Sequence, residues 1–285
     1  MMSAMATTPG TLITVAPTGA ELSKGDFPQL PTTLEELVET AVSCEAAGAS
    51  MIHLHIRDGE HRPTLDHGHL KAAVDALREQ TSLIVQLSTG GSVHDPLEQR
   101  LTVLDAEPDS CSLTCGTTNF GDDVFLNPYG FMSDLYVQAQ EREVVPEFEL
   151  FDLGHVAALA RLIDTHGLPF GGKVHVDFVT GVPGGMPGTP AALLAGVAML
   201  PAEVTSWAAT GIGRTHLPIA AAALAAGGHL RVGMEDNVVF SRGVQVQHNR
   251  ELVERVAHLA EVMQRPPMST QDARALLGVK DRRAA

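Results

Sequence analysis

The chain has 285 residues and a formal net charge of −15, which argues against binding to nucleic acid or to an anionic membrane surface. Its hydrophobic content of 44% and charged content of 19% are typical of a globular protein with a sizeable core, and they exclude an extensively disordered chain. Local basic residues can still bind an anionic small molecule. The length fits one (β/α) barrel, which typically needs about 250 residues.

The compartment is predicted from three features. The segment Met1–Thr11 has neither a basic region nor an apolar run, so we expect no signal peptide. The most apolar helical stretch, Leu217–Ala226, is too short to cross a bilayer, so no membrane partner is expected. Cys44, Cys111 and Cys115 form a sparse, odd set that favours a reducing compartment. We therefore expect a cytoplasmic protein with these thiols in its core.

Apolar runs and helical patterns alternate along the chain. We predict strands at 12–17, 51–56, 83–87, 110–114, 145–150, 173–180, 204–209 and 230–234. We predict helices at 34–47, 66–79, 96–104, 131–141, 153–166, 191–200, 217–226 and 245–264, and a short C-terminal helix at 270–277. Thr32 or Thr33 is expected to cap the first helix. Residues 120–129 are expected to form an irregular insertion.

The order of these elements predicts a single-domain TIM (β/α)8 barrel over residues 1–285, with a short C-terminal helical tail. No composition break, repeat or linker divides the chain. The runs at 83–87 and 204–209 are nearly continuous apolar, as buried parallel strands should be. The longer polar loops follow the strands, which places the functional rim at the strand carboxyl ends. A doubly wound sheet is the alternative architecture.

The stretch Met51–Asp58 places His53, His55 and Arg57 between apolar residues, which is the two-residue period of a strand with one polar face. Residues i and i+2 of a strand lie on the same side, so the two imidazoles project together. Such a pair suits a divalent metal ion, with Zn²⁺ first. Two buried structural histidines are the alternative that this motif alone leaves open.

A third ligand is needed, because an open catalytic zinc site often combines two histidines with one carboxylate. Glu235 is the leading candidate, since it follows the eighth strand, which neighbours the first strand and faces the same central pocket as the second. Asp58 and Glu149 are the competitors. Taken alone, Glu235 would be interpreted as a solvated loop acid.

Three loops at predicted strand ends could approach a ligand. Ser88–Gly91 offers hydroxyl and backbone N–H groups that suit a carboxylate, although the same residues also suit a plain turn. The segment 211–214 opens the seventh helix, at a rim position where barrels favour anions such as phosphate. The segment 181–190 is dense in Gly and Pro, which lets backbone come close to a ligand.

Seven motifs follow one another along the chain: Thr18-Gly19-Ala20-Glu21, His53-Leu54-His55-Ile56-Arg57, Gln86-Leu87-Ser88-Thr89-Gly90-Gly91, Gly116-Thr117-x-Asn119-Phe120-Gly121-Asp122-Asp123, Gly181-Val182-Pro183-Gly184-Gly185-Met186, Gly211-Ile212-Gly213-Arg214 and Gly233-Met234-Glu235-Asp236-Asn237. Together they resemble the motifs of the β-keto acid cleavage enzymes. The resemblance runs from about Leu12 to the C-terminal tail.

This resemblance implies a zinc-dependent TIM barrel, usually a homotetramer, in which a β-keto acid reacts with acetyl-CoA to give acetoacetate and a new acyl-CoA. It implies that His53, His55 and Glu235 bind the zinc ion. It also implies that Arg231 and Asp236 act in deprotonating the substrate. Because arginine stays protonated, we expect Asp236 to accept the proton and Arg231 to hold and polarise it.

The resemblance also assigns substrate contacts. The carboxylate end of the β-keto acid is expected to contact Ser88, Gly91, Thr117 and Asn119. Glu21 and Glu149 match positions that face the far end of the substrate, which favours a cationic tail such as that of 5-amino-3-oxohexanoate or dehydrocarnitine. A local arginine such as Arg57 could instead neutralise these acids. Arg214 and Arg242 are the candidates for holding CoA.

Two other functions are alternatives to β-keto acid cleavage. A zinc amidohydrolase on the same fold would need its His-x-His on the first strand and histidines at the ends of the fifth and sixth strands. Here the first strand has none, the fifth ends in Glu149, and His175 lies early on the sixth. A non-catalytic barrel that only binds a small molecule is the other alternative, and the intact set of His53, His55, Glu235 and Asp236 counts against it.

Overall fold

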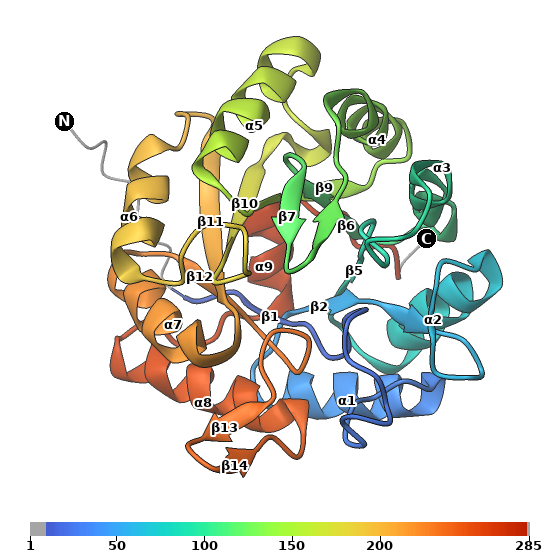
Figure 1. The fold of residues 1–285 in the computed structure, drawn as a ribbon, viewed down its shortest axis with the longest axis vertical. Coiled ribbons are helices and arrows are strands. Elements are labelled where there is room, and N and C mark those ends of the chain that lie inside the picture. Colours follow the sequence, from blue (N-terminus) through green and yellow to red (C-terminus); the bar gives the residue numbers. More distant parts are fainter. Residues whose placement is uncertain (1–9, 284–285) are drawn as a thin grey trace.

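Eight of the apolar runs form parallel strands that close into a barrel in the computed structural model, which describes residues 10–283. These strands are β1 (Ile13–Val15), β2 (Met51–Leu54), β5 (Ile84–Leu87), β6 (Ser110–Thr114), β9 (Val145–Leu150), β10 (Val174–Thr180), β11 (Val204–Gly211) and β12 (His229–Val232). Their order around the barrel is β1-β12-β11-β10-β9-β6-β5-β2 (Figure 1). The predicted TIM barrel is confirmed, and β12 pairs with β1 as expected.

Helices surround the barrel in the predicted alternation (Figure 1). They are α1 (Leu34–Ala46), α2 (His67–Gln80), α3 (Leu97–Leu101), α4 (Tyr129–Glu141), α5 (Leu153–His166), α6 (Pro190–Met199), α7 (His216–Ala225) and α8 (Asn249–Val262). Helix α1 begins at a capping box between Thr33 and Glu36, which satisfies free backbone N–H groups. None of the helices in residues 10–283 combines the length and apolar character that a membrane span requires.

The prediction of an irregular insertion at 120–129 is wrong. Strands β7 (Thr118–Phe120) and β8 (Asp123–Phe125) pair as an antiparallel hairpin there. Gly121 lies in its turn with φ +65°, a conformation that glycine adopts without strain. Two further hairpins, β3 (Ile56–Arg57) with β4 (Pro63–Thr64) and β13 (Val239–Ser241) with β14 (Val244–Gln245), follow β2 and β12.

Two predicted helix boundaries are also wrong for local reasons. The helix predicted from residue 245 begins at Asn249, because residues 244–245 pair in the β13–β14 hairpin. The helix predicted at 96–104 divides into α3 and a 3-10 helix, η1 (Thr102–Ala106). Neither change moves a barrel strand, so the rim positions expected for the site are retained.

The C-terminal helix α9 (Thr270–Leu277) closes the amino-terminal end of the barrel (Figure 1). Its buried side chains pack in one apolar cluster with Leu12, which precedes β1, and with the first residues of β2, β5 and β9, namely Met51, Ile84 and Val145. Arg274 of α9 also donates a hydrogen bond of 3.0 Å to Asp109. Because this end is sealed by apolar packing, the carboxyl ends of the strands are left to carry the pocket.

We expect Leu277→Ala to lower the free energy of unfolding by about 2–5 kcal/mol, because it removes buried methyl groups and leaves a cavity. The shift in the urea midpoint measures this loss. Leu168→Ala makes the same change at a side chain that is 48% exposed, and it should change stability by less than about 0.5 kcal/mol. Equal midpoints for the two variants would contradict the packing role of α9.

Candidate active site

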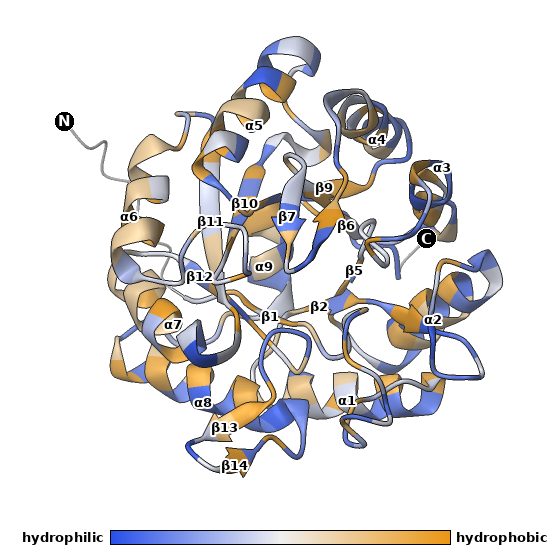
Figure 2. Cartoon of the chain, in the orientation of Figure 1, coloured by the Kyte–Doolittle hydropathy of each residue, from blue (hydrophilic) through white to orange (hydrophobic). Residues whose placement is uncertain are grey.

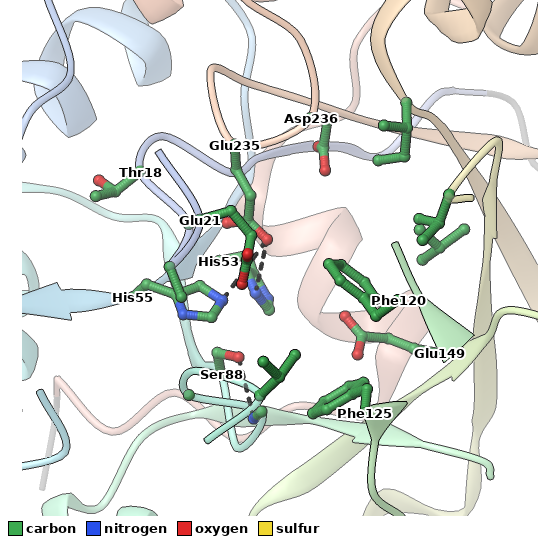
Figure 3. Close-up of a pocket in the computed structure, with 18 of the residues that line it drawn as sticks. Thr18, Glu21, His53, His55, Ser88, Phe120, Phe125, Glu149, Glu235 and Asp236 are labelled. Carbon is green, nitrogen blue, oxygen red and sulfur yellow. Dashed lines mark hydrogen bonds and ion pairs between the residues drawn. The ribbon is translucent and has the colours of Figure 1, made fainter. Parts of the chain in front are cut away.

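The candidate active site is a pocket at the carboxyl ends of the barrel strands (Figure 3). Phe120 and Phe125 lie across this pocket from His53 and His55 (Figure 3). Its polar lining residues include Glu21, His53, His55, Ser88, Glu149, Arg231, Glu235 and Asp236. Its apolar lining residues include Leu22, Val93, Phe120, Phe125, Phe151, Val179, Val182 and Ile212.

The two histidines of the His-x-His motif converge on Glu235. His53 lies on β2 and His55 follows this strand directly, and their ring centroids are 5.4 Å apart. The Nε2 atoms of His53 and His55 lie 3.7 and 3.6 Å from Oε1 of Glu235. One candidate ligand atom from each of the three residues lies within 4.8 Å of the other two. The structure thus brings together the three residues that the sequence analysis selected.

The backbone at Gly19 lies against the side chain of Glu235, which extends toward the two histidines. A Cβ atom at Gly19, which has φ +65°, would lie 2.6 Å from Cγ of Glu235, so glycine is required there. The competing ligand Asp58 is held elsewhere, since it accepts hydrogen bonds from the backbone and side chain of Arg62. Buried Oε2 of Glu235 has no hydrogen-bond partner among the described residues. A carboxylate with one oxygen, Oε1, near two imidazole nitrogens and the other, Oε2, buried without a donor fits a bound divalent cation.

Arg231 on β12 connects three carboxylates, of which Glu149 and Asp236 are buried and Glu235 is partly exposed. It donates to both oxygens of Asp236, at 3.2 Å from Nε and 3.0 Å from Nη2. Its Nη1 donates to Oε1 of Glu149 at 3.1 Å, and its Nη2 also donates to Glu235. Oε2 of Glu149 accepts a hydrogen bond of 2.8 Å from Thr114. One guanidinium therefore faces three acids, which leaves excess negative charge that a divalent cation would offset.

Burial and these neighbours shift the pKa values of the site residues in different directions. Burial raises the pKa of Asp236 to about 7, against the opposing effect of Arg231. Burial also acts to raise the pKa of Glu235, but Arg231 and the two histidines outweigh it and hold this pKa at about 2. Burial and the Arg231 charge lower the pKa of His53 to about 4. His53 is thus a neutral imidazole at pH 7, the form that binds metals.

Gln86, to which the sequence analysis gave no role, orients His53. It lies on β5 directly opposite His53 in the strand register and is fully buried. Nδ1 of His53 donates to Oε1 of Gln86 at 2.5 Å. Nε2 of Gln86 in turn donates to the hydroxyl of Ser110 at 3.2 Å. The first contact fixes the tautomer that leaves Nε2 of His53 free to bind a metal ion. A lone polar residue in the apolar run 83–87 was the available signal.

Two loops beside the histidines are held by backbone contacts. The first contains Ser88 and Gly91, which both line the pocket, and the hydroxyl of Ser88 accepts a hydrogen bond from the backbone of Gly90 at 3.2 Å. The second contains Glu21. Arg57 holds this loop by donating to the carbonyl oxygens of Gly19 at 2.6 Å and Leu22 at 2.9 Å. Arg57 therefore binds backbone, and it forms no hydrogen bond with Glu21.

Three phenylalanines form much of the apolar lining. Phe120 and Phe125 come from the β7–β8 hairpin, and Phe151 follows β9. Their ring centroids lie 6.1 to 6.4 Å apart with the rings in edge-to-face contact. Phe151 also packs with Val179 and Val182 in a small apolar cluster. The sequence analysis did not identify this cluster, because its residues come from separate loops.

Four expected contact residues lie outside the lining of this pocket. Thr117 is exposed, and its hydroxyl accepts a hydrogen bond of 2.9 Å from the backbone of Asn127. Asn119 is exposed on β7, where successive side chains point to opposite sides, so Phe120 faces the pocket and Asn119 does not. Arg214 and Arg242 are exposed in the loops that follow β11 and β12.

Comparisons with known proteins agree with this arrangement. A family model described as "BKACE: beta-keto acid cleavage enzyme" matches residues 11–279. A 3-keto-5-aminohexanoate cleavage enzyme of Acetoanaerobium sticklandii is 39% identical over 270 residues, which cover 94% of this chain and 98% of that protein. A 3-oxoadipate:acetyl-CoA acetyltransferase of Cupriavidus necator is 34% identical over 271 residues, which cover 94% of each protein.

A solved structure shares the fold. The ternary complex of ObcA with a C4-CoA adduct and oxalate has a TM-score of 0.79 and 20% sequence identity, over 88% of this chain and 68% of that chain. At this identity the likeness shows the barrel alone. The sequence matches are stronger, since they cover nearly the whole chain and name enzymes that cleave β-keto acids or transfer acetyl groups. The chain therefore belongs to the β-keto acid cleavage enzyme family.

Proposed function

We propose that this enzyme is zinc-dependent and converts a β-keto acid and acetyl-CoA into acetoacetate and a new acyl-CoA. One observation carries the proposal: His53, His55 and Glu235 converge beside the buried pair of Arg231 and Asp236 in a single pocket. This pocket lies in a member of the β-keto acid cleavage enzyme family. Membership of this family favours β-keto acid cleavage over the two alternative functions, a zinc amidohydrolase and a non-catalytic binding barrel.

His53, His55 and Glu235 would hold the zinc ion through Nε2 of each imidazole and a carboxylate oxygen. When bound, zinc would supply a Lewis acid against the negative charge that develops on substrate oxygen. Arg231 contributes by fixing the Glu235 carboxylate, to which it donates a hydrogen bond. Gln86 contributes by holding the ring of His53. These contacts preorganise the ligands before any ion arrives.

Asp236 is the proposed general base. A pKa of about 7 places its proton affinity near neutral pH, and general bases are most effective when their pKa lies near the pH of the reaction. Its two contacts with Arg231 hold the carboxylate in place, and its side chain lines the pocket beside Glu235. Arg231 stays charged and cannot itself accept a proton. Asp236 would therefore remove a proton from C2 of the β-keto acid.

The remaining steps conserve atoms and charge. The C2 carbanion attacks the carbonyl carbon of acetyl-CoA, and the CoA thiolate leaves. The thiolate then attacks the former keto carbon, and the bond between C2 and C3 breaks. The pair of electrons from this bond stays on C2, which regains the proton from Asp236 as acetoacetate. The new acyl group leaves as its CoA thioester.

Substrate orientation is proposed from the two ends of the β-keto acid. Ser88 and Gly91 would bind its carboxylate, because both line the pocket next to the histidines. Thr117 and Asn119 would act on this site only indirectly, through the β7–β8 hairpin. Glu149 is less suited to a cationic tail than predicted, since both of its oxygens already accept hydrogen bonds. Glu21 remains the acid available to such a tail.

The names of the relatives differ in tail chemistry. The relative that is 39% identical is named for 3-keto-5-aminohexanoate, which carries an amino group, and the relative that is 34% identical for 3-oxoadipate, which carries a second carboxylate. Of these two, the first suits a pocket that contains Glu21. We propose Arg214 and Arg242 as contacts of the CoA phosphates, because both are exposed on loops at the carboxyl ends of strands.

The proposed reaction is tested by incubating zinc-loaded protein with acetyl-CoA and a panel of β-keto acids while assaying acetoacetate. The panel pairs 5-amino-3-oxohexanoate and dehydrocarnitine with neutral β-keto acids of matched length. Asp236→Asn should lower turnover by about 10²- to 10⁴-fold with zinc content unchanged. Asp164→Asn, the same change at an exposed position on α5, should have no effect. Near-normal turnover by zinc-loaded Asp236→Asn would refute its role as base.

The orienting contact of Gln86 predicts a change in zinc affinity. Gln86→Leu keeps similar volume but removes the acceptor for Nδ1 of His53, so we expect zinc affinity to fall by about 10- to 100-fold. Competition with a chromogenic chelator measures this without any assay of turnover. Gln80→Leu alters an exposed glutamine at the end of α2 and should bind zinc as the wild type does. Equal affinities in the two variants would count against the contact.

We also propose that the protein is a homo-oligomer, with a tetramer as the expected form. Helix α6 supports association: residues 190–202 contain no charged or polar side chain. Leu194 and Met199 on this helix are 46% and 52% exposed. Figure 2 shows α6 almost free of hydrophilic residues, unlike α2. An exposed apolar helix of this kind is typical of an interface between subunits.

The cytoplasmic location of the protein stays a prediction.

Introducing charge on α6 should break this association. We expect the double variant Leu194→Glu and Met199→Glu to shift the molar mass in light scattering from oligomer to smaller species, because it would bury two carboxylates in an apolar contact. Val262→Glu, at a side chain of α8 that is 62% exposed, is the control and should keep the wild-type mass. An unchanged mass for the double variant would exclude α6 from the interface.

A further inference from the structure

Arg100 on α3 is a buried cation whose hydrogen bonds all go to neutral groups. Its side chain is 2% exposed. Its Nε donates to the carbonyl of Thr89 at 2.7 Å, its Nη1 to the carbonyl of Leu126 at 2.7 Å, and its Nη2 to Oδ1 of Asn127 at 2.6 Å. Buried charges are normally paired with opposite charges. Among the buried arginines of residues 10–283, Arg57 likewise donates only to carbonyl oxygens, those of Gly19, Leu22 and His61.

Two other buried arginines show the usual pattern. Arg231 donates to three carboxylates in the pocket. Arg274 donates to Asp109. Burial lowers the pKa of Arg100 to about 10, which still leaves it charged at neutral pH. A positive charge thus lies in the protein interior without a hydrogen-bonded acid.

The contacts of Arg100 join the two segments that border the proposed carboxylate site. Thr89 belongs to the Ser88–Gly91 loop, and Leu126 and Asn127 follow strand β8. The guanidinium carbon lies 4.8 Å from the ring centre of Phe125, which lines the pocket. A Cβ at Gly90 would lie 3.0 Å from Cζ of the same ring, so the loop and the hairpin are in close contact.

The same contacts extend to Thr117. Asn127 accepts from Arg100 through its side chain, and its backbone N–H donates to the hydroxyl of Thr117 at 2.9 Å. A second aromatic ring, Phe131, lies 4.4 Å from the guanidinium carbon on the side of α4. Arg100 is thus held between two rings while it donates to both the loop and the hairpin.

We propose that Arg100 is a positioning residue for the carboxylate of the substrate, an inference that rests on the proposed function. Its hydrogen bonds hold the Ser88–Gly91 loop against the segment that follows β8. Its positive charge favours an anion on the pocket side of that loop. Glu149 and Asp95 act on Arg100 through their charges, but neither accepts a hydrogen bond from it, so a bound carboxylate would add to the negative charge that Arg100 meets. The ligand class is a short β-keto carboxylate, and a neutral analogue gains nothing from this charge.

The test compares one anion with one neutral analogue of the same shape. Acetoacetate and acetoacetamide are titrated into zinc-loaded protein by calorimetry, and the ratio of their dissociation constants is the readout. Arg100→Met and Arg100→Gln both remove the charge, and Gln serves if Met does not fold. We expect either variant to lower the preference for acetoacetate about tenfold, as loss of one nearby charge at an effective dielectric of about 20 implies. Arg100→Lys keeps the charge and should retain most of the preference.

Arg265 offers a matched control. Its guanidinium also donates only to backbone carbonyls, those of Leu224, Gly227 and Gly228, away from the pocket. Arg265→Met should therefore leave the acetoacetate preference unchanged. In turnover assays, the neutral Arg100 variants should raise KM for the β-keto acid and leave KM for acetyl-CoA unchanged.

The outcomes separate the two proposals. Equal weakening of acetoacetate and acetoacetamide in the neutral Arg100 variants would overturn the inference and leave only a structural role. A loss of preference in Arg100→Lys as large as in Arg100→Gln would overturn it as well. Failure of the wild-type protein to bind acetoacetate or to convert any β-keto acid would instead overturn the proposed function, and the inference with it.

Discussion

The contact of one guanidinium with three carboxylates organises the pocket. Arg231 fixes Glu149, Glu235 and Asp236 at once, so each acid has one orientation. Because a single positive charge faces three acids, the cluster still has excess negative charge. Glu235 keeps its charge while the pKa of Asp236 rises to about 7. Burial outweighs Arg231 at Asp236, whereas Arg231 and the two histidines outweigh burial at Glu235. This balance separates a candidate metal ligand from a candidate base, although the two residues are adjacent in sequence.

Strand order explains why these residues meet. Strand β12 closes the barrel against β1, and β1 pairs with β2, so only one short strand separates Arg231 from His53. On the other side of β2, the register sets Gln86 directly opposite His53. The candidate ligands therefore come from the ends of the second and eighth strands of the barrel, and the supporting Gln86 comes from the third. No local segment could assemble this set, which is why closure of the barrel is a condition for the site.

Much of this could be predicted from the sequence, because periodic patterns and rim positions are local properties. The bounds of β6, β9, α5 and α9 agree with the predicted ranges, and the histidines and Glu235 meet as expected. The β7–β8 hairpin was missed, since its strands have three residues each and no clear apolar period. The direction of Asn119 depends on the alternation within β7, so its place outside the pocket lining could not be predicted either. Gln86 and Arg100 were missed because their roles depend on neighbours distant in the chain.

The acceptor type separates Arg231 from Arg100. Arg231 is saturated with carboxylates, so an incoming anion adds little to its electrostatic stabilisation. Arg100 donates hydrogen bonds only to neutral acceptors, so its charge is less offset by direct contacts than that of Arg231. A substrate that carries a carboxylate at one end and loses a proton at C2 needs both kinds of cation. Its carboxylate needs an unneutralised charge nearby, and the base needs a cation that holds it without removing its proton affinity. Under the proposed function, Arg100 and Arg231 divide these requirements between the carboxylate of the substrate and the base that acts at C2.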